Sequence, residues 1–186
     1  MNLASVCTAL SPTVESNNPQ VYVKTNVGGF TIELYPDKAP ETVANFLNYV
    51  EKGYYSGTIF HRVIKGFMIQ GGGFTPLGMH KETRAPIQIE SRNGLKNARG
   101  SIAMARTNNP DSATSQFFIN TVDNANLDYP SFDGHGYTVF GKVITGLDVV
   151  DAIEGAPTVT TMTPNGPMQD WPKEEICINK VSMKEA

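Results

Sequence analysis

Three segments of the chain combine one cation, several polar side chains and a large share of apolar residues, and they hold the candidates for chemistry. They span residues 60–72 (FHRVIKGFMIQGG), 115–120 (SQFFIN) and 132–141 (FDGHGYTVFG). In the first, the Lys65-Gly66 connection predicts a hairpin that brings Arg62 close to Gln70. Strand alternation then places Met68 on the same face as Gln70, so an arginine lies beside apolar side chains.

The second segment divides its side chains between two faces. Alternation sends Gln116 and Phe118 to one side and Phe117 and Ile119 to the other. The second pair forms a core face, whereas the first mixes an amide with an aromatic ring. The third segment is a glycine-rich loop that enters a strand.

Other common chemistries lack support in the sequence. The three histidines, His61, His80 and His135, have no metal-ligand spacing to Cys, Asp or Glu. There is no Gly-x-Ser-x-Gly motif, and the glycine triplet at 71–73 lacks the following Lys-Ser/Thr of a phosphate-binding loop. We interpret the triplet as a close-packed turn or bulge. No metal and no cofactor is predicted.

The elements that would position these segments are mostly short strands. Strands are predicted at 21–25, 30–35, 58–64, 67–70, 87–89, 101–105, 116–121, 137–143 and 175–183, separated by turn-forming residues. Helices are predicted at 40–52, where Val43, Phe46, Leu47 and Val50 have helical spacing after Pro40, and at 147–153. This pattern predicts a mainly β protein, an antiparallel barrel or sandwich whose open ends are covered by two helices.

Length and charge restrict the function further. A chain of 186 residues corresponds to one domain, which we place at residues 21–186. With 15 Lys+Arg and 18 Asp+Glu, the net charge of -3 argues against nucleic acid as a partner. No apolar run is long enough to span a bilayer, so no membrane association is expected. Cys7 and Cys177 indicate neither a disulfide framework nor a metal cluster.

Residues 1–20 are predicted to be an N-terminal extension outside the fold. The stretch from Leu3 to Leu10 is apolar, yet no Lys or Arg occurs before Lys24. A complete signal peptide has a basic start and a longer apolar region, so this segment resembles the end of one. The extension favours a periplasmic over a cytoplasmic location.

Taken singly, the three segments have simpler interpretations: a strand arginine is usually solvated, and a Phe-Phe pair usually belongs to a core. Together they form a specific pattern. Residues 60–72, 100–106, 115–120 and 139–143 resemble the signature segments of the cyclophilins, the cyclosporin-sensitive peptidyl-prolyl isomerases, in their bacterial form. The resemblance runs from about Val21 to Val181.

This resemblance implies a closed eight-stranded antiparallel barrel capped by two α-helices, with an active groove on its outer face. It implies that Arg62 is catalytic and that substrate binding involves Phe67, Met68, Gln70, Ala105, Arg106, Thr107, Gln116, Phe118, Asn126, Leu127 and Tyr137. Many eukaryotic members have Ala-Asn-Ala where this chain has Ala105, Arg106 and Thr107. Asn126 stands where human-type members carry tryptophan, and Tyr137 where they carry histidine.

The implied activity is cofactor-free rotation about Xaa-Pro bonds in peptides and unfolded proteins, by a monomer. The alternative is a non-catalytic module whose groove binds proline-containing segments. Arg62 separates the two, because binding alone would not need a donor directed at the proline nitrogen. Cyclosporin A is expected to bind weakly, since Asn126 lacks the apolar face of a tryptophan.

Overall fold

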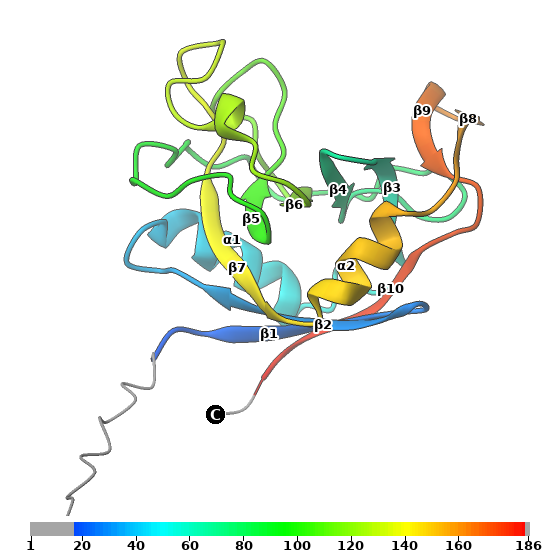
Figure 1. The fold of residues 1–186 in the computed structure, drawn as a ribbon, viewed down its shortest axis with the longest axis horizontal. Helices are drawn as coiled ribbons and strands as arrows, with labels where there is room; N and C mark the ends of the chain where they lie inside the picture. Colours follow the sequence, from blue (N-terminus) through cyan, green and yellow to red (C-terminus); the bar gives the residue numbers. More distant parts are fainter. Residues whose placement is uncertain (1–16, 185–186) are drawn as a thin grey trace, which may run out of the picture.

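The computed structural model describes residues 17–184 (Figure 1). The predictions for Cys7 and for most of the N-terminal extension therefore lie outside the described residues. Eight antiparallel strands close into a barrel in the order β1-β10-β3-β4-β6-β5-β7-β2. In chain order they are β1 (Gln20–Thr25), β2 (Gly28–Leu34), β3 (Thr58–Ile64), β4 (Met68–Gly71), β5 (Ser101–Met104), β6 (Phe117–Asn120), β7 (Val139–Thr145) and β10 (Cys177–Met183). Of the two predicted architectures, barrel and sandwich, the structure has the closed barrel.

Alternating side chains fill the barrel. Phe30, Ile32 and Leu34 of β2 are buried, as their spacing predicts. On β6, Phe117 and Ile119 belong to the main core, whereas Phe118 belongs to a second apolar cluster. The interior is thus a packed core rather than a channel, so a ligand site has to lie on the outside.

Two helices cap the barrel: α1 (Pro40–Glu51) and α2 (Leu147–Glu154). Pro40 occupies the first turn of α1, where its missing N–H costs nothing. The Glu90 carboxylate replaces a local cap, because it accepts hydrogen bonds from the N–H groups of Glu41 (3.1 Å) and Thr42 (2.8 Å). Phe46 then packs against Tyr55, Phe117 and Phe140 in the core.

Two parts of the chain differ from the sequence-based expectation. The predicted strand at 87–89 was wrong: Ile87 makes one isolated bridge to Ala113, and the flanking residues have no ladder partner among the described residues. In addition, β8 (Thr158–Thr163) and β9 (Gly166–Pro172) form a separate two-stranded sheet that was not predicted. Trp171 of this hairpin packs with Ile59 and Phe74 beside β3.

The arrangement leaves a lobe on each side of the upper barrel in Figure 1. The loops between β4 and β7, with the 3-10 helix η1 (Ala125–Leu127), form one lobe, and the β8–β9 hairpin forms the other. Within residues 17–184, no helix is long and apolar enough to cross a membrane.

Candidate active site

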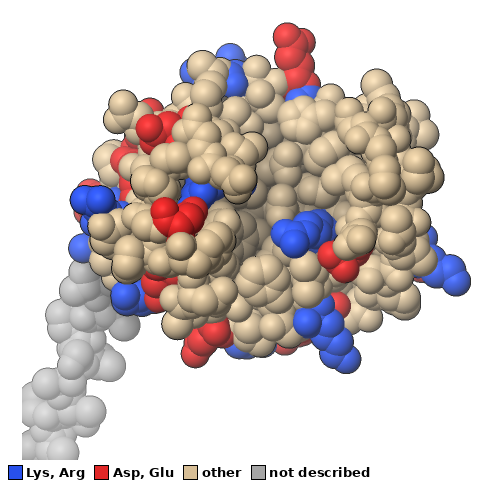
Figure 2. Space-filling model, turned by 90° about the horizontal axis from the view of Figure 1, so that it is seen from above, with Lys and Arg blue, Asp and Glu red and all other residues tan. Residues whose placement is uncertain are grey.

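A cavity of about 410 Å³ opens on the outer face of the barrel. Seen from above, this face is hollowed between the two lobes, and the residues around the hollow are mostly uncharged (Figure 2). The volume falls in the range of pockets that bind small molecules or a few residues of a peptide. The cavity is lined by His61, Arg62, Phe67, Met68, Gln70, Phe74, Ala105, Arg106, Gln116, Phe118, Leu127, Tyr137 and Met168.

Arg62 lies on β3, with its partner residue Gln70 on β4, as the hairpin predicts. Its side chain is exposed. Within the described part of the chain it makes no hydrogen bond or ion pair. Its N–H donors are therefore free to bind a substrate at the edge of an apolar cavity.

Two glutamines meet on one side of the cavity. The Gln70 Nε2 donates to the Gln116 Oε1 at 3.0 Å, and the Gln116 backbone carbonyl accepts from the N–H of Ala105 at 3.0 Å. Gly73 makes room for this pair: a Cβ at that position would lie 2.5 Å from the Gln116 Cγ. The triplet was expected to be a close-packed turn or bulge; Gly71 ends β4, and Gly72 and Gly73 form a close-packed bend directly after it.

The apolar part of the cavity is formed by the second cluster. Met68, Phe118 and Leu127 are buried there, and Phe67 and Tyr137 pack against them. The 3-10 helix η1 is held in place by Asn124, whose Nδ2 donates to the Phe67 carbonyl at 2.8 Å. These side chains form a surface without charge, suited to a saturated ring.

Three lining residues were not predicted: His61, Phe74 and Met168. His61 reaches the cavity because β3 has a bulge between Phe60 and Arg62, which breaks the strict alternation of its side chains. Its ring lies 4.6 Å from that of Phe74. Met168 belongs to β9, an element that the sequence did not reveal. A histidine directly before the catalytic candidate was the only signal available.

His61 is uncharged in the folded protein. Burial, together with the positive charge of Arg62 and the neighbouring His80, lowers the pKa of His61 to about 3. Its Nδ1 is buried without a hydrogen-bond partner among the described residues. Neutral His61 thus adds no positive charge to the cavity.

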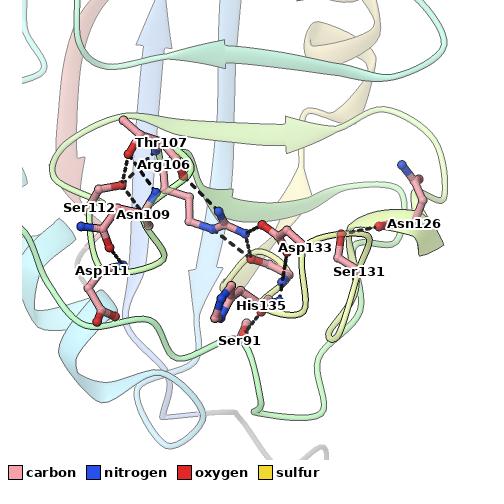
Figure 3. Close-up of polar contacts among 11 residues, drawn as sticks. Ser91, Arg106, Thr107, Asn109, Asp111, Ser112, Asn126, Ser131, Asp133 and His135 are labelled. Atoms are coloured by element: carbon pink, nitrogen blue, oxygen red, sulfur yellow. Dashed lines mark hydrogen bonds and ion pairs between the residues drawn. The ribbon is translucent and has the colours of Figure 1, made fainter.

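Ten of the twelve site residues predicted from the sequence line the cavity, and two do not. The Thr107 Oγ1 lies 2.8 Å from the Ser112 Oγ, and its N–H donates to the same oxygen. Asn126 is exposed in η1, and its carbonyl accepts a hydrogen bond from Ser131 (Figure 3). Leu127, the residue after Asn126, does line the cavity.

Arg106 lines the cavity but is not free. Its guanidinium is directed into the loop that carries Asp133, with an ion pair of 2.6 Å (Figure 3). The two arginines of the cavity therefore differ: the Arg62 guanidinium has no partner among the described residues, whereas all three nitrogens of the Arg106 guanidinium donate hydrogen bonds to the protein. Within residues 17–184, no group of His, Cys, Asp and Glu is arranged to hold a metal ion.

A closed barrel with an outer cavity, an arginine without a partner among the described residues and an apolar pocket defines a class of barrel proteins whose candidate site lies on the outer face. Comparisons with known proteins narrow the class. The sequence model of the family described as cyclophilin-type peptidyl-prolyl cis-trans isomerase/CLD matches residues 20–183. The chain belongs to this family, and its activity is peptidyl-prolyl cis-trans isomerisation.

Similar sequences and structures agree. Peptidyl-prolyl cis-trans isomerase B of Escherichia coli K12 is 54% identical over 163 residues, covering 87% of this chain and 97% of that protein. A peptidyl-prolyl cis-trans isomerase of Acinetobacter baylyi is 54% identical over 167 residues, covering 90% of this chain and 86% of that protein.

Among solved structures, a cyclophilin-type isomerase of Cryptosporidium parvum superposes with a TM-score of 0.77 at 31% identity, over 91% of this chain and 99% of that one. A second structure of that protein, determined in the presence of the dipeptide Ala-Pro, gives a TM-score of 0.76 at 31% identity. It covers 90% of this chain and 99% of that one.

Proposed function

We propose that the cavity binds the proline of an Xaa-Pro segment and that Arg62 accelerates its isomerisation by stabilising the twisted amide. The observation that carries this proposal is the free guanidinium of Arg62 at the edge of an uncharged pocket. Rotation is slow because resonance gives the C–N bond a barrier of about 18–20 kcal/mol. Cis and trans differ by only about 0.5–1 kcal/mol, so the obstacle is kinetic.

Arg62 suits this reaction because the twisted amide differs from both planar forms at one atom. When resonance is lost, the proline nitrogen recovers its lone pair and becomes a hydrogen-bond acceptor. Arg62 donates to that nitrogen while permanently charged, so the interaction exists only in the transition state and lowers the barrier. The step needs no nucleophile and no proton transfer.

The other lining residues hold the substrate so that only one bond rotates. Phe67, Met68, Phe118 and Leu127 receive the pyrrolidine ring, and Gln70 hydrogen-bonds the flanking backbone. The N–H of Ala105 is already bound to the Gln116 carbonyl, so the backbone group that Ala105 offers is its own carbonyl oxygen. A site with so few polar contacts suits many proline-containing peptides and unfolded proteins.

The experiment measures cis-trans exchange in an Ala-Pro test peptide by NMR, with the protein present at catalytic concentration. We expect strong acceleration that a chelator does not change and that is nearly flat between about pH 6 and 8, because the pKa of His61, about 3, lies far below this range and the proposed step transfers no proton. Binding of the peptide without faster exchange would favour the alternative, a non-catalytic proline-binding module. A bell-shaped pH profile would indicate a general acid or base instead.

A further inference from the structure

Arg106 is a buried cation, and each of its three guanidinium nitrogens donates at least one hydrogen bond to the protein. Only 3% of its side chain is exposed. Its Nε and Nη2 both donate to the Gly136 carbonyl, at 3.0 and 2.6 Å. The Nη2 also donates to the Asp133 Oδ2 at 2.6 Å, and the Nη1 to the Thr107 carbonyl at 3.0 Å. A buried charge persists only where it is paired and hydrogen-bonded, and these contacts satisfy both conditions.

Asp133 connects this cation to the loop that precedes β7. Its Oδ1 accepts hydrogen bonds from the N–H groups of His135 (3.0 Å) and Gly136 (3.1 Å), while its Oδ2 binds Arg106. The hydrogen bond from Arg106, followed by these backbone N–H groups, holds the pKa of Asp133 well below its usual range. The carboxylate therefore folds residues 133–136 into a turn and fastens that turn to the guanidinium (Figure 3).

The next residue, Tyr137, carries this arrangement into the cavity. The Arg106 Cζ lies 4.4 Å from the centroid of the Tyr137 ring. The Tyr137 ring contacts the Phe118 ring edge to face, with the ring centroids 5.7 Å apart. The Tyr137 backbone N–H donates to the Leu127 carbonyl at 3.1 Å. Contacts thus run without a gap from the ion pair, through one aromatic ring, to two residues of the apolar pocket.

We propose that Arg106 and Asp133 are positioning residues, which fix the Tyr137 wall of the pocket while Arg62 donates to the substrate. This inference rests on the proline pocket of the proposed function. A pocket that holds the proline ring binds the cis, trans and twisted forms of the substrate equally well. A less rigid pocket wall therefore weakens the binding of all three forms. The expected signature is a higher KM with kcat nearly unchanged.

The test compares Arg106→Gln, Arg106→Lys and Asp133→Asn on an Ala-Pro test peptide. Arg106→Gln should raise KM about five- to tenfold with kcat within about twofold, which corresponds to losing a desolvated cation–π contact and its ion pair. Arg106→Lys should have a KM between those of Arg106→Gln and wild type, because an ammonium group lacks the planar, forked donors of a guanidinium. Arg99→Gln is the matched control: it breaks an exposed Arg–Asp pair of 2.8 Å to Asp151, outside the cavity lining, and should leave KM unchanged.

Coupling between Arg106 and the Tyr137 ring is tested by combining Arg106→Gln with Tyr137→Ala. If Arg106 acts through Tyr137, the double variant should have the same KM as Tyr137→Ala within about twofold. The proposal fails if the effects on KM multiply, if the variants lose thermal stability while KM stays unchanged, or if kcat alone falls. Should Arg106→Gln not fold, Arg106→Lys and Asp133→Asn give the same readouts. Failure of the Arg62 mechanism would appear instead in the kcat of Arg62 variants.

Discussion

At the scale of single residues, the environment decides what a cation does. Arg62 and Arg106 line one cavity, yet Arg62 is exposed and unpaired among the described residues, whereas Arg106 is buried and bound to Asp133. His61, between Phe60 and Arg62, is kept neutral by burial. Among the described residues that line the cavity, Arg62 is therefore the one positive charge without a partner.

The neutral state of His61 makes the stability of the protein depend on pH. The folded pKa of about 3 lies below the ordinary value of 6.5, so between these values the unfolded state binds a proton that the folded state does not. The stability that neutral His61 retains is complete above about pH 6.5 and is lost progressively as the pH falls from 6.5 towards 3. Between pH 7.5 and 4.5 wild type should lose about 2–3 kcal/mol more unfolding free energy than His61→Gln.

Urea unfolding of both proteins at the two pH values measures this difference. His135→Gln, which removes an exposed histidine, is the control and should follow wild type. Parallel pH dependences for wild type and His61→Gln would show that His61 is not the cause.

At the scale of elements, regular spacing in the sequence predicts structure well, whereas local irregularity escapes it. The period of α1 and the alternation of β6 identified the helix, the core face and the Gln116–Phe118 face. The bulge in β3 was invisible, because one extra residue does not change the local hydrophobic pattern. Consequently His61 was not assigned to the site.

The β8–β9 hairpin was missed for a different reason. Its side chains are largely exposed, and its threonines, prolines and glycine give no clear apolar alternation. Only Trp171 and its neighbour Pro172 are buried in this hairpin. Met168 therefore could not be placed at the cavity from the sequence. The predicted strand at 87–89 shows the converse, since alternation alone does not supply a pairing partner.

The turn after β4 provides a test of element packing. In Gly73→Ala the new Cβ would displace the Gln116 side chain, which it would approach to 2.5 Å, and so disturb the Gln70–Gln116 hydrogen bond. We expect kcat/KM to fall by about five- to tenfold, the worth of roughly one neutral hydrogen bond. Gly155→Ala is the control, because its nearest atoms lie at 3.5 Å. Wild-type kcat/KM for Gly73→Ala in a folded protein would refute the role of this pair.

The 3-10 helix η1 bears on cyclosporin A, which we expect to bind less well than to human-type cyclophilins. Asn126 retains a donor but lacks the broad face of an indole, and about 100 Å² of lost apolar contact corresponds to about 2.5 kcal/mol. Asn126→Trp should therefore tighten cyclosporin A binding by about tenfold or more, measured by calorimetry. Because Asn126 is exposed and does not line the cavity, kcat/KM on a short peptide should change only a few-fold. An unchanged affinity for cyclosporin A would show that Asn126 does not limit binding and would indicate that other differences, such as Arg106 and Tyr137, do.

At the scale of the whole molecule, the closed and filled barrel acts as a rigid support for an outer site. Strands β3, β4 and β6 supply Arg62, Gln70 and Phe118, and the two lobes supply Leu127 and Met168 on opposite sides. The reaction requires rotation about one bond between fixed contacts, which a packed core can hold in place. The proposed mechanism thus needs one free hydrogen-bond donor and a fixed pocket.

The most direct test of the Arg62 mechanism is kcat/KM of Arg62→Ala on an Ala-Pro peptide, measured alongside thermal melting. Because Arg62 is exposed, the fold and Tm should be nearly unchanged, while kcat/KM falls by about a hundredfold or more. Arg62→Lys should rescue poorly, and Lys65→Ala, which removes a nearby cation outside the cavity lining, should behave as wild type. Near-wild-type kcat/KM in a folded Arg62→Ala protein would contradict catalysis by this arginine.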